Sequence, residues 1–395
     1  MIITYLIIFT NLIGACLNDV SLLMMQMSSV ERILEYVEWT DHEKAWETPA
    51  LPVEKRKTVP KWPNQGKMNF KNVKLRYRPG LPLVLKGVSF NVKPSSKVGI
   101  VGRTGSGKST LLLAIMRVVE IPEEFTNKGE SFIEVDGVRL DQIGLHLARR
   151  ATVIIPQDPF LMQGTLKFNI DPFDEFTQLE ILECLKRVKL DELLVQDSPK
   201  NKNNLQNGNK NGDQGGNENM DTETENQQIY LETERSILGR GQEPPGFVDQ
   251  ATLDQRLLNY EIEAKGSNLS LGQRQLICIA RALIRKPKIL LMDEATANID
   301  EKTDSLIQGI IINQLPNTTV LTIAHRLNTI ILYDKVVVLD NGIKIEEGSP
   351  HSLLQSPGIF ESMIKEGGTE FEAKMRELAW SKHISIEEED SKDNE

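Results

Sequence analysis

A glycine-rich turn that ends in lysine and serine is the strongest chemical signal in this 395-residue sequence. Residues 102–109 read GRTGSGKS and fit the pattern G-x-x-x-x-G-K-[ST]. The turn stands between a short apolar run, KVGIV, and a helical run, STLLLAIMRVV. Glycines let the backbone wrap around a polyphosphate, so that its N–H groups and the positive end of the helix dipole face the phosphate oxygens. We therefore predict a nucleoside triphosphate site here rather than a flexible glycine-serine turn.

Different residues of this turn would contact different parts of a bound triphosphate. Lys108 supplies a point charge to the β- and γ-phosphates, and the Ser109 hydroxyl is a ligand for Mg²⁺. The predicted nucleotide-binding residues of the turn are Gly102, Arg103, Thr104, Gly105, Ser106, Gly107, Lys108, Ser109 and Thr110. Mg²⁺ is accordingly the expected cofactor.

An apolar run that ends in two carboxylates is the second signal. Residues 289–294 read ILLMDE, a pattern that by itself more often marks a strand entering a solvated loop. Downstream of a phosphate loop, however, Asp293 is placed to hold Mg²⁺ directly or through water. Glu294 would then polarise the attacking water as a general base. The two motifs together predict a P-loop nucleoside triphosphatase.

The elements that must position these residues alternate between strand and helix. Strand-like alternation is found in MNFKNVKLRY and VLKGVSFNVK, and short apolar runs follow at KVGIV, ATVIIP, KILLMD, TVLTIA and KVVVLD. Several of these runs are separated by helical stretches. The pattern predicts an α/β fold with a parallel sheet covered on both faces.

The composition limits the class of partner. Net charge is −10, whereas a surface that follows nucleic-acid phosphates is normally basic, so we expect no nucleic-acid partner. Cys16, Cys184 and Cys278 are far apart and have no metal-ligand or C-x-x-C spacing. Reduced thiols in a cytosolic domain are the expectation.

The first 18 residues, MIITYLIIFTNLIGACLN, are apolar and uncharged. They are slightly short for a bilayer span of about 20 residues, and a signal peptide or a buried core helix are the alternatives. No basic residue precedes the apolar run, and the helical pattern continues through VSLLMMQMSSVERILEYVE. We expect the end of a transmembrane helix and its cytosolic extension over 1–40. The basic residues that follow, Arg32, Lys44, Lys55, Arg56 and Lys57, are typical of a cytosolic flank.

Two further segments lack a regular period. Residues 41–66, rich in proline and charge, are predicted to be a linker. An Asn-, Gln- and Gly-rich tract begins near Asp197, has too little apolar surface to offset its ordering entropy, and is predicted to be a disordered insertion to about Leu257. The predicted main domain therefore covers 67–368, and a C-terminal helix with an acidic tail covers 369–395.

The segment NLSLGQRQL at 268–276 narrows the class further. A serine and a glycine that open a helix form a second phosphate-binding end. Here the chain resembles the ABC ATPases, whose LSGGQ signature it matches except that Leu271 replaces the third-position glycine. The resemblance implies that Ser270, Gly272 and Gln273 close over ATP bound to a second nucleotide-binding domain. It also implies a RecA-like parallel-sheet core, an antiparallel β subdomain and an α-helical subdomain.

The resemblance assigns roles to four more residues. Tyr77 matches the aromatic residue that stacks on adenine, although a tyrosine is also common in an ordinary strand. Gln157 matches the glutamine that reaches Mg²⁺ and the nucleophilic water. Asp300, which ends the segment Ala297-Asn-Ile-Asp, matches the loop that communicates across the dimer. His325 matches the switch histidine at the γ-phosphate, although a lone histidine after a strand is usually structural.

The motifs from Met27 to Gly368 look like the second nucleotide-binding domain of the C subfamily, the multidrug-resistance-associated exporters. The presence of Glu294 favours that hydrolysing position. The expected function is an ATPase that drives transport through transmembrane domains, at the cytoplasmic side of a membrane. A channel-gating or regulatory relative and a soluble ABC ATPase are the alternatives. The chain lacks the paired cassettes or coiled coil of the soluble type, and nothing inside the domain separates export from gating.

Overall fold

The computed structural model describes residues 2–39, 62–190, 250–295, 299–324 and 326–392. The chain divides into two units, Met1–Glu47 and Thr48–Glu395, which are described separately. Most of the predicted linker, the insertion up to residue 249, His325 and part of the loop before Asp300 lie outside the described residues.

The N-terminal unit contains one long helix, α1 (Ile2–Trp39), which spans 38 residues. It joins the apolar start and the helical extension, which the sequence predicts as consecutive parts of one helix. Residues Ile2–Glu38 have the length and apolar composition needed to cross a membrane, with a mean hydropathy of 1.7 in the most apolar window. The same length and composition also suit a signal sequence at this end of a chain.

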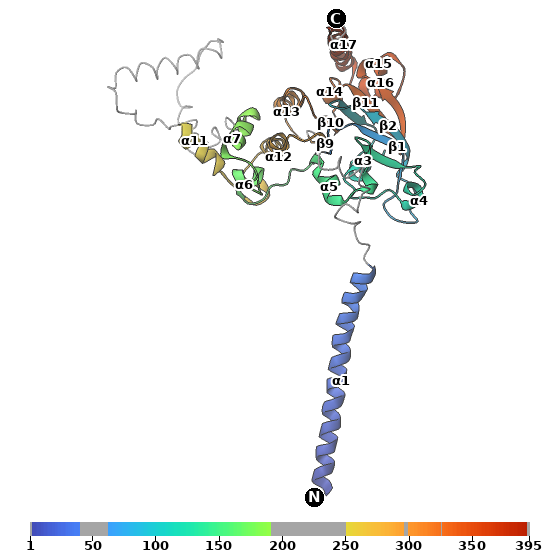
Figure 1. The fold of residues 1–395 in the computed structure, drawn as a ribbon, viewed down its shortest axis with the longest axis vertical. Helices are drawn as coiled ribbons and strands as arrows, with labels where there is room; N and C mark the ends of the chain where they lie inside the picture. The colour runs from blue at the N-terminus through green and yellow to red at the C-terminus, as the bar shows by residue number, and fades with distance from the viewer. Residues whose placement is uncertain (1, 40–61, 191–249, 296–298, 325, 393–395) are drawn as a thin grey trace, which may run out of the picture. The chain divides into compact units, whose positions relative to one another are not determined.

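A six-stranded sheet forms the centre of the second unit (Figure 1). Its order is β12-β11-β3-β10-β9-β6, and the strands from β11 to β6 are mutually parallel, whereas β12 runs antiparallel to β11. Its strands are β3 (Lys97–Val101), β6 (Thr152–Ile155), β9 (Ile289–Asp293), β10 (Thr319–Ile323), β11 (Lys335–Asp340) and β12 (Ile343–Gly348). The five parallel strands coincide with the five apolar runs in the sequence, to within a residue at each end. This confirms the predicted parallel sheet.

An antiparallel sheet with the order β2-β1-β4-β5 packs beside this core. Its strands are β1 (Met68–Leu75), β2 (Leu85–Val92), β4 (Phe132–Val135) and β5 (Val138–Arg139). A two-stranded sheet pairs β7 (Gly164–Thr165) with β8 (Glu261–Ile262). The antiparallel subdomain and the parallel core therefore agree with the expected ABC-type fold.

The helices fall into three groups (Figure 1). The phosphate-loop helix α3 (Lys108–Ile115) lies with α4 (Glu123–Thr126) and α5 (Leu145–Arg150). Short 3₁₀ turns occur in the described part of the chain at Leu140–Gln142 and, before α12, at Ala264–Gly266. A helical subdomain contains α6 (Leu166–Ile170), α7 (Gln178–Arg187), α11 (Gln250–Leu258), α12 (Leu271–Arg285) and α13 (Glu301–Gln314). The C-terminal group contains α14 (Leu327–Ile330), α15 (Pro350–Gln355), α16 (Ile359–Lys365) and α17 (Thr369–Lys392).

Both faces of the central sheet are covered by apolar packing. Leu290 and Met292 of β9 belong to the cluster under α12 and α13. Their neighbours Ile289 and Leu291 point the other way, into the cluster with α3 and the antiparallel sheet. Successive strand residues face opposite sides, so a run without polar residues is what a strand covered on both faces requires. A third cluster joins β3 and β11 to the C-terminal helices.

The structure differs from the sequence pattern at three boundaries. Helix α3 ends at Ile115 rather than near Val119, because the backbone at Arg117 turns to φ 52° and its buried guanidinium donates to the carbonyls of Leu140 and Ile143. The segment predicted to be disordered to about Leu257 includes α11, which occupies Gln250–Leu258, and Leu257 is buried. Its buried residues Leu257 and Leu258 are adjacent and give no helical period, so sequence periodicity missed this helix.

The predicted linker also ends too late. From Trp62 onward the chain is folded onto the antiparallel sheet, where the buried Trp62 indole donates to the Val135 carbonyl at 2.7 Å. Asp136 accepts four backbone N–H groups from residues 64–67 at 2.7 to 3.0 Å. These bonds order a segment whose composition resembles a linker.

Candidate nucleotide-binding site

The loops that carry the predicted chemistry meet at the carboxyl edge of the parallel strands. Gly102 follows β3, Asp293 ends β9 and Gln157 follows β6. The register aligns Ile155 of β6 with Met292 of β9, and Asp293 of β9 with Ile323 of β10. Parallel strands present their carboxyl ends at the same edge, where open α/β sheets bind ligands.

The phosphate loop has the backbone shape that its glycines allow. Gly102, Gly105 and Gly107 adopt φ values of 152°, 81° and 97°. Residues other than glycine rarely adopt such positive φ values. Gly107 directly precedes α3 and is its N-cap. The loop therefore delivers the N–H groups at the start of a helix to one side of the sheet edge, as an anion site requires.

Lys108 is folded into this loop. Its side chain is buried, and Nζ donates to the carbonyl oxygens of Gly102 at 2.8 Å and Arg103 at 3.1 Å. Burial lowers the pKa of Lys108, while the negative charges of Glu294 and Asp293 oppose that shift. The ammonium group and the two carboxylates are thus close enough to interact electrostatically.

Ser109 links the phosphate loop to the acidic pair. Its hydroxyl donates to Asp293 Oδ1 at 3.4 Å, although the two residues are 184 positions apart. Burial raises the pKa of Asp293, and the nearby charge of Glu294 raises it further. A cation would offset the energetic cost of holding this carboxylate ionised. A hydroxyl and a carboxylate are also the oxygen ligands that Mg²⁺ prefers, so the donor set fits the expected cofactor.

Glu294 leaves the strand with an unusual backbone. Its φ is 48°, and its N–H donates to the Ile323 carbonyl at 3.1 Å. The left-handed turn breaks the simple alternation of strand side chains directly after Asp293. The two carboxylates can therefore take separate positions while both influence Lys108.

Tyr77 lies beyond the end of β1, which stops at Leu75, and so is not an ordinary strand residue. Its side chain is 49% exposed, and its hydroxyl lies 2.9 Å from Thr110 Oγ1 in α3. About half of the side chain is therefore exposed beside the start of the phosphate-loop helix. Thr110 itself is buried, so it positions the tyrosine rather than contacting bulk solvent.

The turn between β11 and β12 supports the phosphate loop, a contribution that sequence reasoning missed. Gly342 N–H donates to the Ser106 carbonyl at 3.1 Å. A Cβ atom on Gly102 would lie 2.0 Å from the Leu339 carbonyl oxygen. The Asn341-Gly342 pair is a strong hairpin signal that could have located the turn, but not what packs against it.

The signature segment opens α12 with reciprocal capping. The Ser270 hydroxyl accepts from Gln273 N–H at 3.2 Å, and the Gln273 side chain accepts from Ser270 N–H at 2.8 Å. A hydroxyl that accepts here still has a hydrogen to donate. Gly272 packs against α13, since a Cβ there would meet Thr303 Cγ2 at 3.0 Å. Leu271 is half-buried against the apolar cluster under α12.

Two of the predicted loops are partly described. Asp300 caps α13 by accepting from Thr303 N–H at 3.0 Å, and this bond lowers the pKa of Asp300. His325 lies outside the described residues, but its neighbour Arg326 donates to the Ile299 carbonyl at 2.8 Å. The segment after β10 is therefore joined to the segment that precedes Asp300. Gln157 is exposed in the loop after β6.

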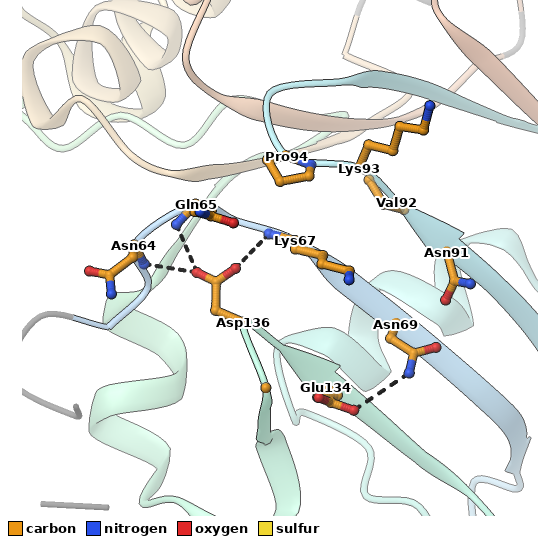
Figure 2. Close-up of a pocket in the computed structure, with 11 residues that line it drawn as sticks. Asn64, Gln65, Lys67, Asn69, Asn91, Val92, Lys93, Pro94, Glu134 and Asp136 are labelled. Carbon is orange, nitrogen blue, oxygen red and sulfur yellow. Dashed lines mark hydrogen bonds between the residues drawn. The ribbon is translucent and has the colours of Figure 1, made fainter.

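An open cavity lies elsewhere and shares no residue with the phosphate loop or the acidic pair. It measures 930 Å³ and lies between the folded end of the predicted linker and the antiparallel sheet. Figure 2 shows Asp136 at its edge, with the carboxylate directed at the backbone of Asn64, Gln65 and Lys67. The carboxylate already holds four N–H groups, so we interpret Asp136 as a structural clamp.

The central parallel sheet, the glycine-rich loop before α3 and the Ser109–Asp293 contact define a P-loop nucleotide-binding protein. The family described as "ABC transporter" matches residues 85–297, which is more than half of the chain. The chain therefore belongs to the ABC transporter family.

The relatives also agree with the predicted subfamily. The ATP-dependent bile acid permease of Saccharomyces cerevisiae is 40% identical over 93% of this chain. ATP-binding cassette sub-family C member 2 of Homo sapiens is 40% identical over 87% of it. The chain spans only 19% and 18% of these two relatives. A bacterial Atm1-family ABC exporter with ATP bound aligns with 88% of this chain, and this chain covers 47% of that one, at a TM-score of 0.60 and 26% identity.

Proposed function

We propose that this chain binds Mg²⁺–ATP at the phosphate loop and hydrolyses it, and that hydrolysis drives transport through membrane domains of the C-subfamily exporter type. The contact between Ser109 Oγ and Asp293 Oδ1 is the observation that carries the proposal. It joins a hydroxyl on the phosphate loop to a carboxylate at the end of β9, where a triphosphate-bound cation would need both.

In this mechanism each residue acts on one part of the reaction. Lys108 and the loop N–H groups bind the β- and γ-phosphates, and Ser109, Asp293 and Gln157 would hold Mg²⁺, which neutralises the charge that develops during phosphoryl transfer. Glu294 takes a proton from the attacking water. Tyr77 stacks on the adenine ring, and His325 contacts the γ-phosphate.

A second nucleotide-binding domain completes the site. Ser270, Gly272 and Gln273 at the start of α12 would close over ATP held by that partner, and Asp300 would lie at the dimer contact. We further propose that 1–40 end a transmembrane domain, that a linker follows, and that the nucleotide-binding domain reaches 368 on the cytoplasmic side of a membrane. The length and apolar composition of α1 support the membrane-spanning part of this proposal.

Paired variants test the proposal in the full chain, purified with its N-terminal helix in detergent. Lys108→Met removes the ammonium charge and should weaken binding of a fluorescent ATP analogue about 100-fold, as the loss of charge-assisted bonds of about 3 kcal/mol implies. Glu294→Gln should retain binding and lower hydrolysis about 10²- to 10⁴-fold. Unchanged ATP affinity in Lys108→Met would refute the assignment of the phosphate loop.

The hydrolysis assay also tests whether two chains must associate. Hydrolysis per chain should rise with protein concentration, because one domain lacks the opposing signature segment. A constant rate per chain across a 100-fold range of concentration would contradict the need for a second domain. That range is chosen to pass from mostly monomer to mostly dimer for a contact of micromolar affinity.

A further inference from the structure

A buried amide in the signature helix contacts the loop that carries Gln157. Gln275, in the second turn of α12, is fully buried, and its Nε2 donates to the Pro156 carbonyl at 3.0 Å. The two residues are 119 positions apart. Pro156 directly precedes Gln157, and the Pro156 oxygen belongs to the planar peptide group that supplies the Gln157 nitrogen. Fixing that oxygen therefore fixes the orientation in which the chain enters Gln157.

A glutamine side chain is energetically unfavourable at this position. Its Oε1 atom is buried without a hydrogen-bond partner among the described residues. Leaving an amide oxygen unsatisfied costs about 1 to 3 kcal/mol, and ordering a glutamine side chain costs more rotamer entropy than ordering a leucine. A leucine of similar volume would pack into the same apolar cluster without either cost. Unlike a leucine, however, the glutamine can donate a hydrogen bond to the Pro156 carbonyl.

Further contacts attach the same loop to α12. Arg281 Nη1 donates to the Phe160 carbonyl at 2.8 Å, and Arg281 Nη2 donates to Asn169 Oδ1 at 3.0 Å. Asn169, fully buried, bonds both the N–H and the carbonyl of Met162 at 2.9 and 2.8 Å. The loop is thus attached to one helix at its start, its middle and, through Asn169, its end.

Helix α12 is also the helix that Ser270 opens. Ser270 and Gln275 are five residues apart on one hydrogen-bonded helix, about 7.5 Å along its axis at 1.5 Å per residue. A displacement of the signature segment therefore carries the Pro156 carbonyl with it. Arg281 and Asn169 hold the outer part of the loop, whereas among the described residues the side chain that bonds the peptide next to Gln157 is Gln275.

We propose that Gln275 is a positioning residue that ties Gln157 to the signature helix, so that the glutamine proposed to reach Mg²⁺ and water moves with the segment proposed to close over a partner's ATP. This inference rests on the proposed function, because it assigns no chemistry to Gln275 itself. It names the connection between two sites that belong to opposite ATP molecules in a dimer.

The test compares Gln275→Leu with Gln308→Leu in the full chain. Gln308 is a suitable control because it is also an amide with one buried unpartnered atom, here Nε2, and it lies on α13 with a hydrogen bond to Tyr333. Gln275→Leu should leave the urea midpoint unchanged or higher, since it removes an unsatisfied oxygen. Amide hydrogen exchange over 156–163 should become faster in Gln275→Leu and stay at the wild-type rate in Gln308→Leu.

The functional readout is the dependence on Mg²⁺. Gln275→Leu should raise the Mg²⁺ concentration for half-maximal hydrolysis about three- to tenfold, the range expected for losing one hydrogen bond, with affinity for metal-free ATP unchanged. In a Gln157→Ala background the same substitution should have no further effect, because the two act through one group. Additive effects would show that Gln275 does not act through Gln157.

The remaining outcomes separate this inference from the proposed function. If Gln157→Ala is impaired in Mg²⁺ dependence while Gln275→Leu matches the wild type, the tie is refuted and the role of Gln157 stands. If Gln157→Ala has wild-type Mg²⁺ dependence, Gln157 is removed from the mechanism and this inference falls with it. If only the urea midpoint of Gln275→Leu changes, Gln275 is a packing residue.

Discussion

The shape of the phosphate loop depends on the space behind Gly102, and replacing that glycine tests this directly. A Cβ at Gly102 would lie 2.0 Å from the Leu339 carbonyl oxygen and 2.8 Å from Ser106 Oγ. Real Cβ contacts are not found below 3.0 Å, so the loop and β11 would have to separate by about 1 Å. Because the Leu339 atom belongs to the backbone of a central sheet strand, a side-chain rotation cannot relieve the overlap.

The expected cost follows from the overlap and the backbone angle. A side chain at φ 152° adds about 1 to 3 kcal/mol of backbone strain, and overpacking adds about 1 to 3 kcal/mol. Gly102→Ala should therefore lower the free energy of unfolding by about 3 kcal/mol or more. A displaced loop no longer directs its N–H groups at the phosphates, so ATP affinity should also fall.

Gly105→Ala is the matched control in the same loop. Gly105 also has a positive φ, 81°, but a Cβ there would have no atom within 4 Å. Gly105→Ala should therefore lower the free energy of unfolding only by the cost of a left-handed backbone, about 1 to 2 kcal/mol. Urea unfolding of both variants and titration of Gly102→Ala with a fluorescent ATP analogue are the assays. Equal losses of stability in the two variants, or wild-type ATP affinity in Gly102→Ala, would refute the reasoning.

Three further predictions use the same measurements. Tyr77→Ala should weaken ATP-analogue binding about tenfold while Tyr77→Phe stays near wild type, because stacking needs the ring and not the hydroxyl; equal losses would contradict stacking. Asp136→Asn should lower the free energy of unfolding by about 1 to 3 kcal/mol without changing ATP affinity, since it replaces one oxygen that accepts backbone N–H groups; a change in affinity would give the cavity a role at the site. Burial raises the pKa of the Cys184 thiol from 9.0 to about 11. Its contribution to stability is therefore complete below pH 9 and is lost as the pH rises toward 11, and this slope in urea unfolding should be absent in Cys184→Ala.

Features encoded in contiguous residues could be predicted well. The phosphate loop, residues 102–109, contains its own glycines, lysine and serine, so its chemistry can be predicted without knowledge of any other segment. The five buried strands were also legible, because a strand covered on both faces needs an uninterrupted apolar run. The roles of Asp293 and Glu294 could be predicted because the two carboxylates directly follow such a strand.

Features that depend on distant contacts could not be predicted in the same way. Helix α11 was hidden because its buried residues Leu257 and Leu258 are adjacent and give no helical period. The folded end of the predicted linker was hidden because Asp136 supplies its hydrogen-bond acceptor. The position of Tyr77 was suggested by resemblance, but its contact with Thr110 required the fold.

The sequence alone determined which residues could bind a triphosphate, because those residues are local and their types are chemically specific. The tertiary structure alone decided what holds them in place: the Leu339 carbonyl behind Gly102, the contact of Ser109 with Asp293, and the amide of Gln275 at Pro156. Each of these contacts joins segments more than 100 residues apart. No local period or propensity encodes such a pair, since it exists only once the parallel strands are in register.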